Sequence, residues 1–347
     1  MNNLEETKRK GQDVKKRIAG LDIVRVTAIF CVIAGHFFLN TPFMQTPFAG
    51  VSMFIQAVFR NIFEIGVPLF LMLTGYLNIN KVVCKKYYRG MVRVLVAYLL
   101  YSVITILFRK YYIHEDLTAV AWVRKILDFS AINYGWYIEM WIGLFLLTPF
   151  LNILYKHIPD KRTKQVLIAT LFLMTAVPSL TNRYEQHIFP DWWQTIWPLL
   201  FFFIGCYIRE YRPIVNTAKG LATIFGISLF NPFFNVLFVK NHSLIQITGG
   251  VDGAFGVIIA VIVFLLLYQR DVSNATTKKI LVKVSFLSLD MYLLSYMFDM
   301  LVYPLLKDRY FVSQGQFGIW FFVAVPAVFL LSLAVSFLFS PIVKKLS

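Results

Sequence analysis

Apolar runs long enough to cross a lipid bilayer recur along the whole chain, and they limit its possible folds more than any other feature. The runs cover residues 20–39, 58–79, 91–108, 133–155, 165–180, 195–209, 219–239, 250–268, 284–306 and 317–339. A bilayer core is spanned by about 20 apolar residues in a helix, whose backbone groups must be hydrogen-bonded within the segment. Only 15% of the 347 residues are charged, against about 25% in soluble domains. The sequence predicts an all-α fold, a polytopic integral membrane helix bundle of about ten transmembrane helices.

Lysines and arginines cluster at alternate connections between these runs. Of the 34, 24 lie on the side that holds the N-terminus and 9 on the opposite side, while Arg25 lies inside the first run. Cytoplasmic loops carry such an excess, so we expect an N-in/C-in, multi-pass protein of the cell membrane. The asymmetry also accounts for the net charge of +16 without a nucleic-acid partner. We expect residues 1–19 to form a basic cytoplasmic tail and residues 20–343 a single membrane-embedded domain, with no soluble catalytic domain.

The first apolar run carries three ionisable side chains, Asp22, Arg25 and His36. Ionisable groups inside a membrane helix are costly and often functional. Asp22 and Arg25 are three residues apart and can pair on one helix face. Arg25 and His36 are eleven apart, which returns to nearly the same face about 16 Å further along. This pattern predicts a polar stripe across the first helix. The alternative is that Asp22 and Arg25 lie among lipid headgroups and His36 is a hydrogen-bonded interior histidine.

Further polar residues suggest what chemistry the bundle could perform. Among the acidic residues inside later runs are Glu64, Glu139, Asp290 and Asp299. A carboxylate beside a neutral histidine makes a general base, although the sequence does not say which acid faces His36. The basic turn after the second run holds Lys85, Lys86, Arg89 and Arg93. Arginines four apart on one helix face could clamp a polyphosphate, but a basic cytoplasmic turn is also what topology requires.

Several common catalytic patterns do not occur in this sequence. It contains no Gly-x-Ser-x-Gly, no Walker loop, no Cys-x-x-Cys and no His-x-x-His. Serine-hydrolase and zinc chemistry therefore have no support, and we expect no metal cofactor.

Several segments resemble, in order, the motifs of the acyltransferase-3 family of integral membrane O-acyltransferases. Leu21-Asp22-x-x-Arg25 followed by Gly35-His36-Phe37 is similar to the family's first-helix signature. Gly66 to Tyr76 resembles its second-helix segment, with Thr74-Gly75 in place of the usual Ser-Gly. Further matches in family order are the Arg89 and Arg93 pair, Trp136 to Phe150, Phe203 to Ile208, and Ser285 to Leu294. The resemblance covers nearly the whole chain.

This resemblance implies transfer of an acyl group, usually acetyl from cytoplasmic acetyl-CoA, to a hydroxyl of a cell-envelope glycan. His36 would be the essential base, Arg25 would be essential in the same helix, and Arg89 and Arg93 would contact the CoA phosphates. Many members have a histidine where this chain has Ser295, so either that histidine is dispensable or Asp299 takes its place. Because the chain ends soon after its tenth run, we expect it to modify a polysaccharide, a lipid-linked repeat unit or a small sugar directly.

Two other functions remain open on the residues alone. Intramembrane Arg, Asp, Glu and His also line substrate paths and proton relays, as in a transporter or flippase for a glycan or lipid-linked sugar. No inverted repeat or pair of interrupted runs supports that reading. A membrane anchor or sensor would need a partner domain. Binding of acyl-CoA would separate the acyltransferase from both.

Overall fold

A helix occupies each of the ten apolar runs in the computed structural model, which describes residues 17–116, 118–182, 188–238 and 250–347. Within those residues there is no strand. The helices of the first half are α2 (Ala19–Leu39), α3 (Gly50–Phe63), α4 (Gly66–Asn78), α5 (Lys85–Tyr88), α6 (Gly90–Tyr111), α7 (Ala119–Leu127) and α8 (Trp136–His157). Those of the second half are α9 (Lys161–Thr175), α10 (Pro178–Thr181), α11 (Trp197–Tyr211), α12 (Thr217–Phe238), α13 (Ala254–Leu267), α14 (Ala275–Tyr310), α15 (Gln314–Phe317) and α16 (Phe321–Leu346).

Eight helical stretches within the described ranges are long and apolar enough to cross a membrane. The expected sixth and eighth spans, α11 and α13, are shorter, at 15 and 14 residues. The predicted all-α polytopic membrane bundle is confirmed. Its sidedness and the cytoplasmic placement of residues 1–19 stay predictions, and residues 1–16 lie outside the described part of the chain.

The predicted second span, 58–79, is in fact two helices, α3 and α4, which meet at Glu64 and Ile65. Pro68 explains the interruption. A proline ring clashes with the carbonyl four residues earlier, which here belongs to Glu64. Proline is tolerated in the first turn of a helix, so α4 starts afresh at Gly66 with Pro68 in that turn.

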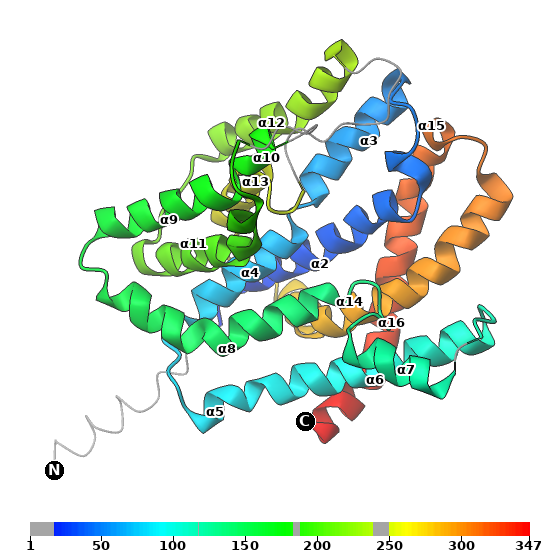
Figure 1. Ribbon diagram of the computed structural model, residues 1–347, viewed down its shortest axis with the longest axis horizontal. Helices are drawn as coiled ribbons and strands as arrows, with labels where there is room; N and C mark the ends of the chain where they lie inside the picture. Colours follow the sequence, from blue (N-terminus) through cyan, green and yellow to red (C-terminus); the bar gives the residue numbers. More distant parts are fainter. Residues whose placement is uncertain (1–16, 117, 183–187, 239–249) are drawn as a thin grey trace.

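Helix α2 lies at the centre of the bundle (Figure 1), packed against α3, α4, α13, α14 and α16. Its contacts with α14 run in parallel. Asp22, in the first turn of α2, meets Ser285 of α14, and His36 meets Asp299 fourteen residues further along each helix. The polar stripe predicted for α2 therefore faces α14, in the interior of the bundle.

Helices α4 and α11 cross at two glycines. A Cβ atom on Gly75 would lie 2.0 Å from the carbonyl oxygen of Phe202, and one on Gly205 would lie 2.1 Å from that of Met72. Small residues let membrane helices approach this closely. The crossing fixes the position of α4, which lines both cavities of the candidate site.

Candidate active site

A buried cluster surrounds His36 near the end of α2. Its Nδ1 lies 3.2 Å from Oδ2 of Asp299 on α14, and both side chains are almost fully buried. The hydroxyl of Tyr134 donates to the same carboxylate oxygen at 2.7 Å. The amide of Asn40 donates to the Tyr134 hydroxyl at 2.9 Å and to the His36 carbonyl at 2.9 Å. Because Nδ1 faces the carboxylate at this ion-pair distance, Nε2 is the ring nitrogen left for a substrate.

Tyr134, in the turn before α8, holds the histidine ring in place. The two rings stack with centroids 3.6 Å apart and an interplanar angle of 26°. Two hydrogen bonds join Tyr134 to α14. Its side-chain hydroxyl donates to Asp299, and its backbone carbonyl accepts from the Tyr292 hydroxyl. Tyr292 and Asp299 are seven residues apart, two helical turns, so both reach Tyr134 from one face of α14.

His36 lines a cavity of about 240 Å³, here called the His36 cavity. Its walls come from α2, α3, α4, α8 and α14, together with Gly250 and Val251. An ion pair also lines it, between Arg60 Nη2 and Glu64 Oε1 at 2.6 Å. Trp136, which is 42% exposed, stands at its edge. The cavity therefore combines a histidine, an ion pair and an aromatic ring.

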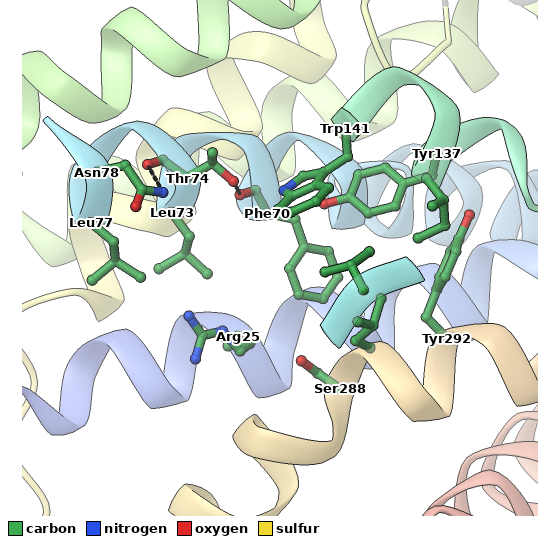
Figure 2. A pocket seen from close by; sticks show the side chains of 13 residues that line it. Arg25, Phe70, Leu73, Thr74, Leu77, Asn78, Tyr137, Trp141, Ser288 and Tyr292 are labelled. Atoms are coloured by element: carbon green, nitrogen blue, oxygen red, sulfur yellow. Dashed lines mark hydrogen bonds between the residues drawn. The ribbon is translucent and has the colours of Figure 1, made fainter. Parts of the chain in front are cut away.

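Arg25 lines a second cavity of about 230 Å³, here called the Arg25 cavity (Figure 2). Its side chain extends from α2 into the space facing Leu73 and Leu77 of α4 (Figure 2). The wall also includes aromatic side chains of α4 and α8 and polar side chains of α4 and α14, among them Phe70, Thr74, Asn78, Tyr137, Trp141 and Ser288. One Nη atom donates to Ser285 Oγ at 3.2 Å, so Arg25 is a cation facing a largely apolar cavity.

Asp22 meets Arg25 through Ser285. The hydroxyl of Ser285 accepts from Arg25 and donates to Asp22 at 2.6 Å. Asp22 itself takes a bidentate pair of hydrogen bonds from Arg17, at 2.6 and 2.7 Å. Asp22 therefore orients Ser285 and holds the start of α2, and it does not line either cavity.

The remaining predicted residues line neither cavity. Glu139 is exposed on α8, and Lys85, Lys86 and Arg89 are exposed around α5. Arg93, one turn into α6, lies with its guanidinium 4.0 Å from the ring centroid of Phe286. No group of three or more metal-ligating side chains occurs among the residues described.

The sequence reasoning found His36, Arg25 and Asp299 but missed Asn40, Tyr134, Ser285 and Tyr292. A signal existed for two of the missed residues, Ser285 and Tyr292. Ser285, Tyr292 and Asp299 follow one another at intervals of seven, which places them on nearly one face of a helix. No comparable spacing marks Tyr134, because a turn carries no periodicity.

Comparison with known protein families supports the resemblance described from the sequence. A family model described as an acyltransferase domain matches residues 18–341, which includes both cavities. The comparisons with curated proteins and with solved structures found no match. Because the family match covers nearly the whole chain, the resemblance read from the sequence motifs is confirmed. The chain belongs to the acyltransferase-3 family and is a multi-pass membrane acyltransferase.

Proposed function

We propose that this protein transfers acetyl from cytoplasmic acetyl-CoA to a hydroxyl of an extracytoplasmic or lipid-linked glycan, across the cell membrane. The observation that carries the proposal is the His36–Asp299 pair, which borders a cavity that lies further along α2 than the Arg25 cavity. A carboxylate on Nδ1 fixes the tautomer of a histidine and stabilises its protonated form. His36 is then equipped to act as a general base through Nε2.

In the proposed reaction, Nε2 of His36 takes the proton of the acceptor hydroxyl as its oxygen attacks the thioester carbonyl. The carbon–sulfur bond of the resulting tetrahedral species then breaks. The departing CoA thiolate receives the proton from the imidazolium, which gives the acetyl ester, free CoA and neutral His36. Asp299 carries the negative charge that balances His36 while it is protonated.

The Arg25 cavity supports binding of the donor. It lies between α2, α4, α6, α8 and α14, and it reaches Asn78, the last residue of α4. The spacing along α2 separates Arg25 from His36 by about 16 Å, a separation that suits an extended pantetheine arm with its phosphates on the cytoplasmic side. Arg25 offers several N–H donors to such a ligand. Lys85, Lys86, Arg89 and Arg93 supply positive charge at that end of the bundle for the nucleotide phosphates.

The His36 cavity supports a polar acceptor. A guanidinium and a carboxylate side by side, Arg60 and Glu64, offer hydrogen-bond donors and acceptors to hydroxyl groups. Trp136 offers an aromatic face at the cavity's edge. Charge inside a membrane helix is costly, so this pair favours a hydroxyl-rich sugar over an apolar lipid chain.

The test is acetyl-CoA turnover by purified protein in nanodiscs made with envelope lipids and glycans, wild type beside His36→Ala. We expect CoA release that depends on His36, with acetyl-CoA binding retained in the variant. Equal turnover by both proteins would remove His36 from the mechanism. Absence of acetyl-CoA binding in the wild type would favour the transporter.

A further inference from the structure

Tyr292 belongs to the walls of both cavities. It lines the Arg25 cavity with Tyr137 and Leu289, and it lines the His36 cavity with Tyr134 and Val67. Its side chain is only 3% exposed. In Figure 2 it stands at the opposite end of the Arg25 cavity from Leu77 and Asn78. Tyr292 therefore lies where the Arg25 cavity ends and the His36 cavity begins.

Four helices line both cavities, with α6 added at the Arg25 cavity and α3 at the His36 cavity. Arg25 and His36 come from α2, Phe70 and Gly66 from α4, and Tyr137 and Trp136 from α8, while Tyr292 of α14 is shared. A molecule that extends from Arg25 to His36 between these helices must pass the Tyr292 ring. That ring is the partition between the two cavities.

Two contacts hold the partition in place. The Tyr292 hydroxyl donates to the carbonyl of Tyr134, the residue that stacks on His36. On the other side, its ring packs edge-to-face against Tyr137, with centroids 5.3 Å apart at 65°. A single hydrogen bond is worth about 1 kcal/mol net. This is enough to keep the ring between the two cavities in the absence of a ligand, and little enough for a bound ligand to displace the ring.

We infer that Tyr292 selects the acyl group of the donor, because the thioester must move past its ring to reach His36. This inference rests on the proposed acyl transfer. A short acyl group such as acetyl needs only a small displacement of the ring. Each added methylene must also fit between Tyr292, Tyr137 and the surrounding helices, so a longer acyl group needs a larger displacement. Removing the ring would open the passage and admit longer chains.

The test compares CoA release from acetyl-, butyryl- and hexanoyl-CoA by the full protein in nanodiscs made with envelope lipids and glycans. We expect wild type to prefer acetyl-CoA and Tyr292→Ala to raise the hexanoyl-to-acetyl ratio of kcat/KM by about tenfold or more, since one methylene in a tight pocket can discriminate tenfold. Tyr292→Phe keeps the ring and loses the hydroxyl, so its ratio should stay close to that of wild type.

Tyr303→Ala is the matched control. It removes a buried tyrosine from the same helix, yet Tyr303 lines neither cavity and packs against Phe37. The control should leave the chain-length ratio unchanged. If Tyr292→Ala does not fold, Tyr292→Trp gives the opposite test, because a larger ring should disfavour butyryl-CoA relative to acetyl-CoA.

An unchanged chain-length ratio in a folded Tyr292→Ala or Tyr292→Trp protein would overturn the inference while leaving the proposed function intact. If wild type bound acetyl-CoA but released no CoA from any of the three donors, or bound none of them, the proposed function itself would fail. The two failures are therefore distinguishable in one set of measurements.

Discussion

Replacing Asp299 by asparagine isolates the charge that the proposed mechanism requires. His36, Tyr134 and Asn40 all approach the same carboxylate oxygen, Oδ2, at 3.2, 2.7 and 3.4 Å. An asparagine amide can place its single oxygen there and accept from the same groups. Asp299→Asn therefore keeps the shape of the cluster and removes its negative charge.

The expected loss follows from the distance between the two groups. A unit charge 3.2 Å from an imidazolium contributes about 5 kcal/mol at an effective dielectric constant of about 20. Each 1.36 kcal/mol of lost transition-state stabilisation costs about tenfold in rate, which sets an upper limit of about 10⁴. General-base assistance contributes about 10² to 10⁴. We therefore expect kcat to fall between about a hundredfold and about ten-thousandfold, with little change in acetyl-CoA affinity.

The assay is CoA release at saturating acetyl-CoA, with acetyl-CoA binding measured separately on the same preparation. Asp290→Asn is the matched control, since Asp290 is also a buried aspartate of α14 and lines neither cavity. It should keep turnover at saturating donor within a few-fold of wild type. Turnover by Asp299→Asn within twofold of wild type would refute the role given to the His36–Asp299 pair.

Three further substitutions test other parts of the site and fold. Tyr134→Phe removes the hydroxyl that donates to Asp299 and keeps the stack on His36; a hydrogen bond to a charged group is worth about 1.5–3 kcal/mol, so kcat should fall by roughly tenfold to a hundredfold in the CoA-release assay. Arg25→Gln removes the cation of the Arg25 cavity and should raise the KM for acetyl-CoA by roughly tenfold, with a smaller effect on kcat; an unchanged KM would place the donor elsewhere. Gly205→Ala forces a Cβ against the Met72 carbonyl, whereas a Cβ added at Gly143 would meet no atom within 4 Å. Because overpacking costs about 1–3 kcal/mol, the Gly205→Ala protein should melt at a lower temperature than the Gly143→Ala protein in a thermal unfolding assay.

Much of the fold could be read from the sequence because lipid imposes a simple rule. Backbone groups in a bilayer must be satisfied within each segment, so apolar runs mark helical segments directly, and each predicted run is helical. What the sequence reasoning missed is the break inside the span 58–79, at Glu64 and Ile65. Pro68 accounts for it, because its ring would clash with the Glu64 carbonyl in a continuous helix. Hydropathy averages over such a break and does not register it.

The candidate site was predictable on one helix and not across helices. The spacing from Arg25 to His36 on α2 correctly indicated one polar face, because helical period relates residues within an element. It could not tell which acid meets His36, since Glu64, Glu139, Asp290 and Asp299 all lie in apolar runs. Only the packing of the helices identifies the partner. Asp299 lies 3.2 Å from the His36 ring, whereas Glu139 is exposed on α8.

The parallel register of α2 and α14 explains why the two cavities can serve one reaction. Asp22 meets Ser285 and His36 meets Asp299, fourteen residues apart on each helix, so the pair stays aligned over about 21 Å. Midway between these contacts on α14 lies Tyr292, the partition of the two cavities. Because residues seven apart drift by only about 20° around a helix, Ser285, Tyr292 and Asp299 lie nearly in line on one face of α14. This face therefore carries the contact with Arg25, the partition and the carboxylate that pairs with His36. In the proposed reaction, the two packed helices would thus set the distance from Arg25, which binds the donor, to His36, the base.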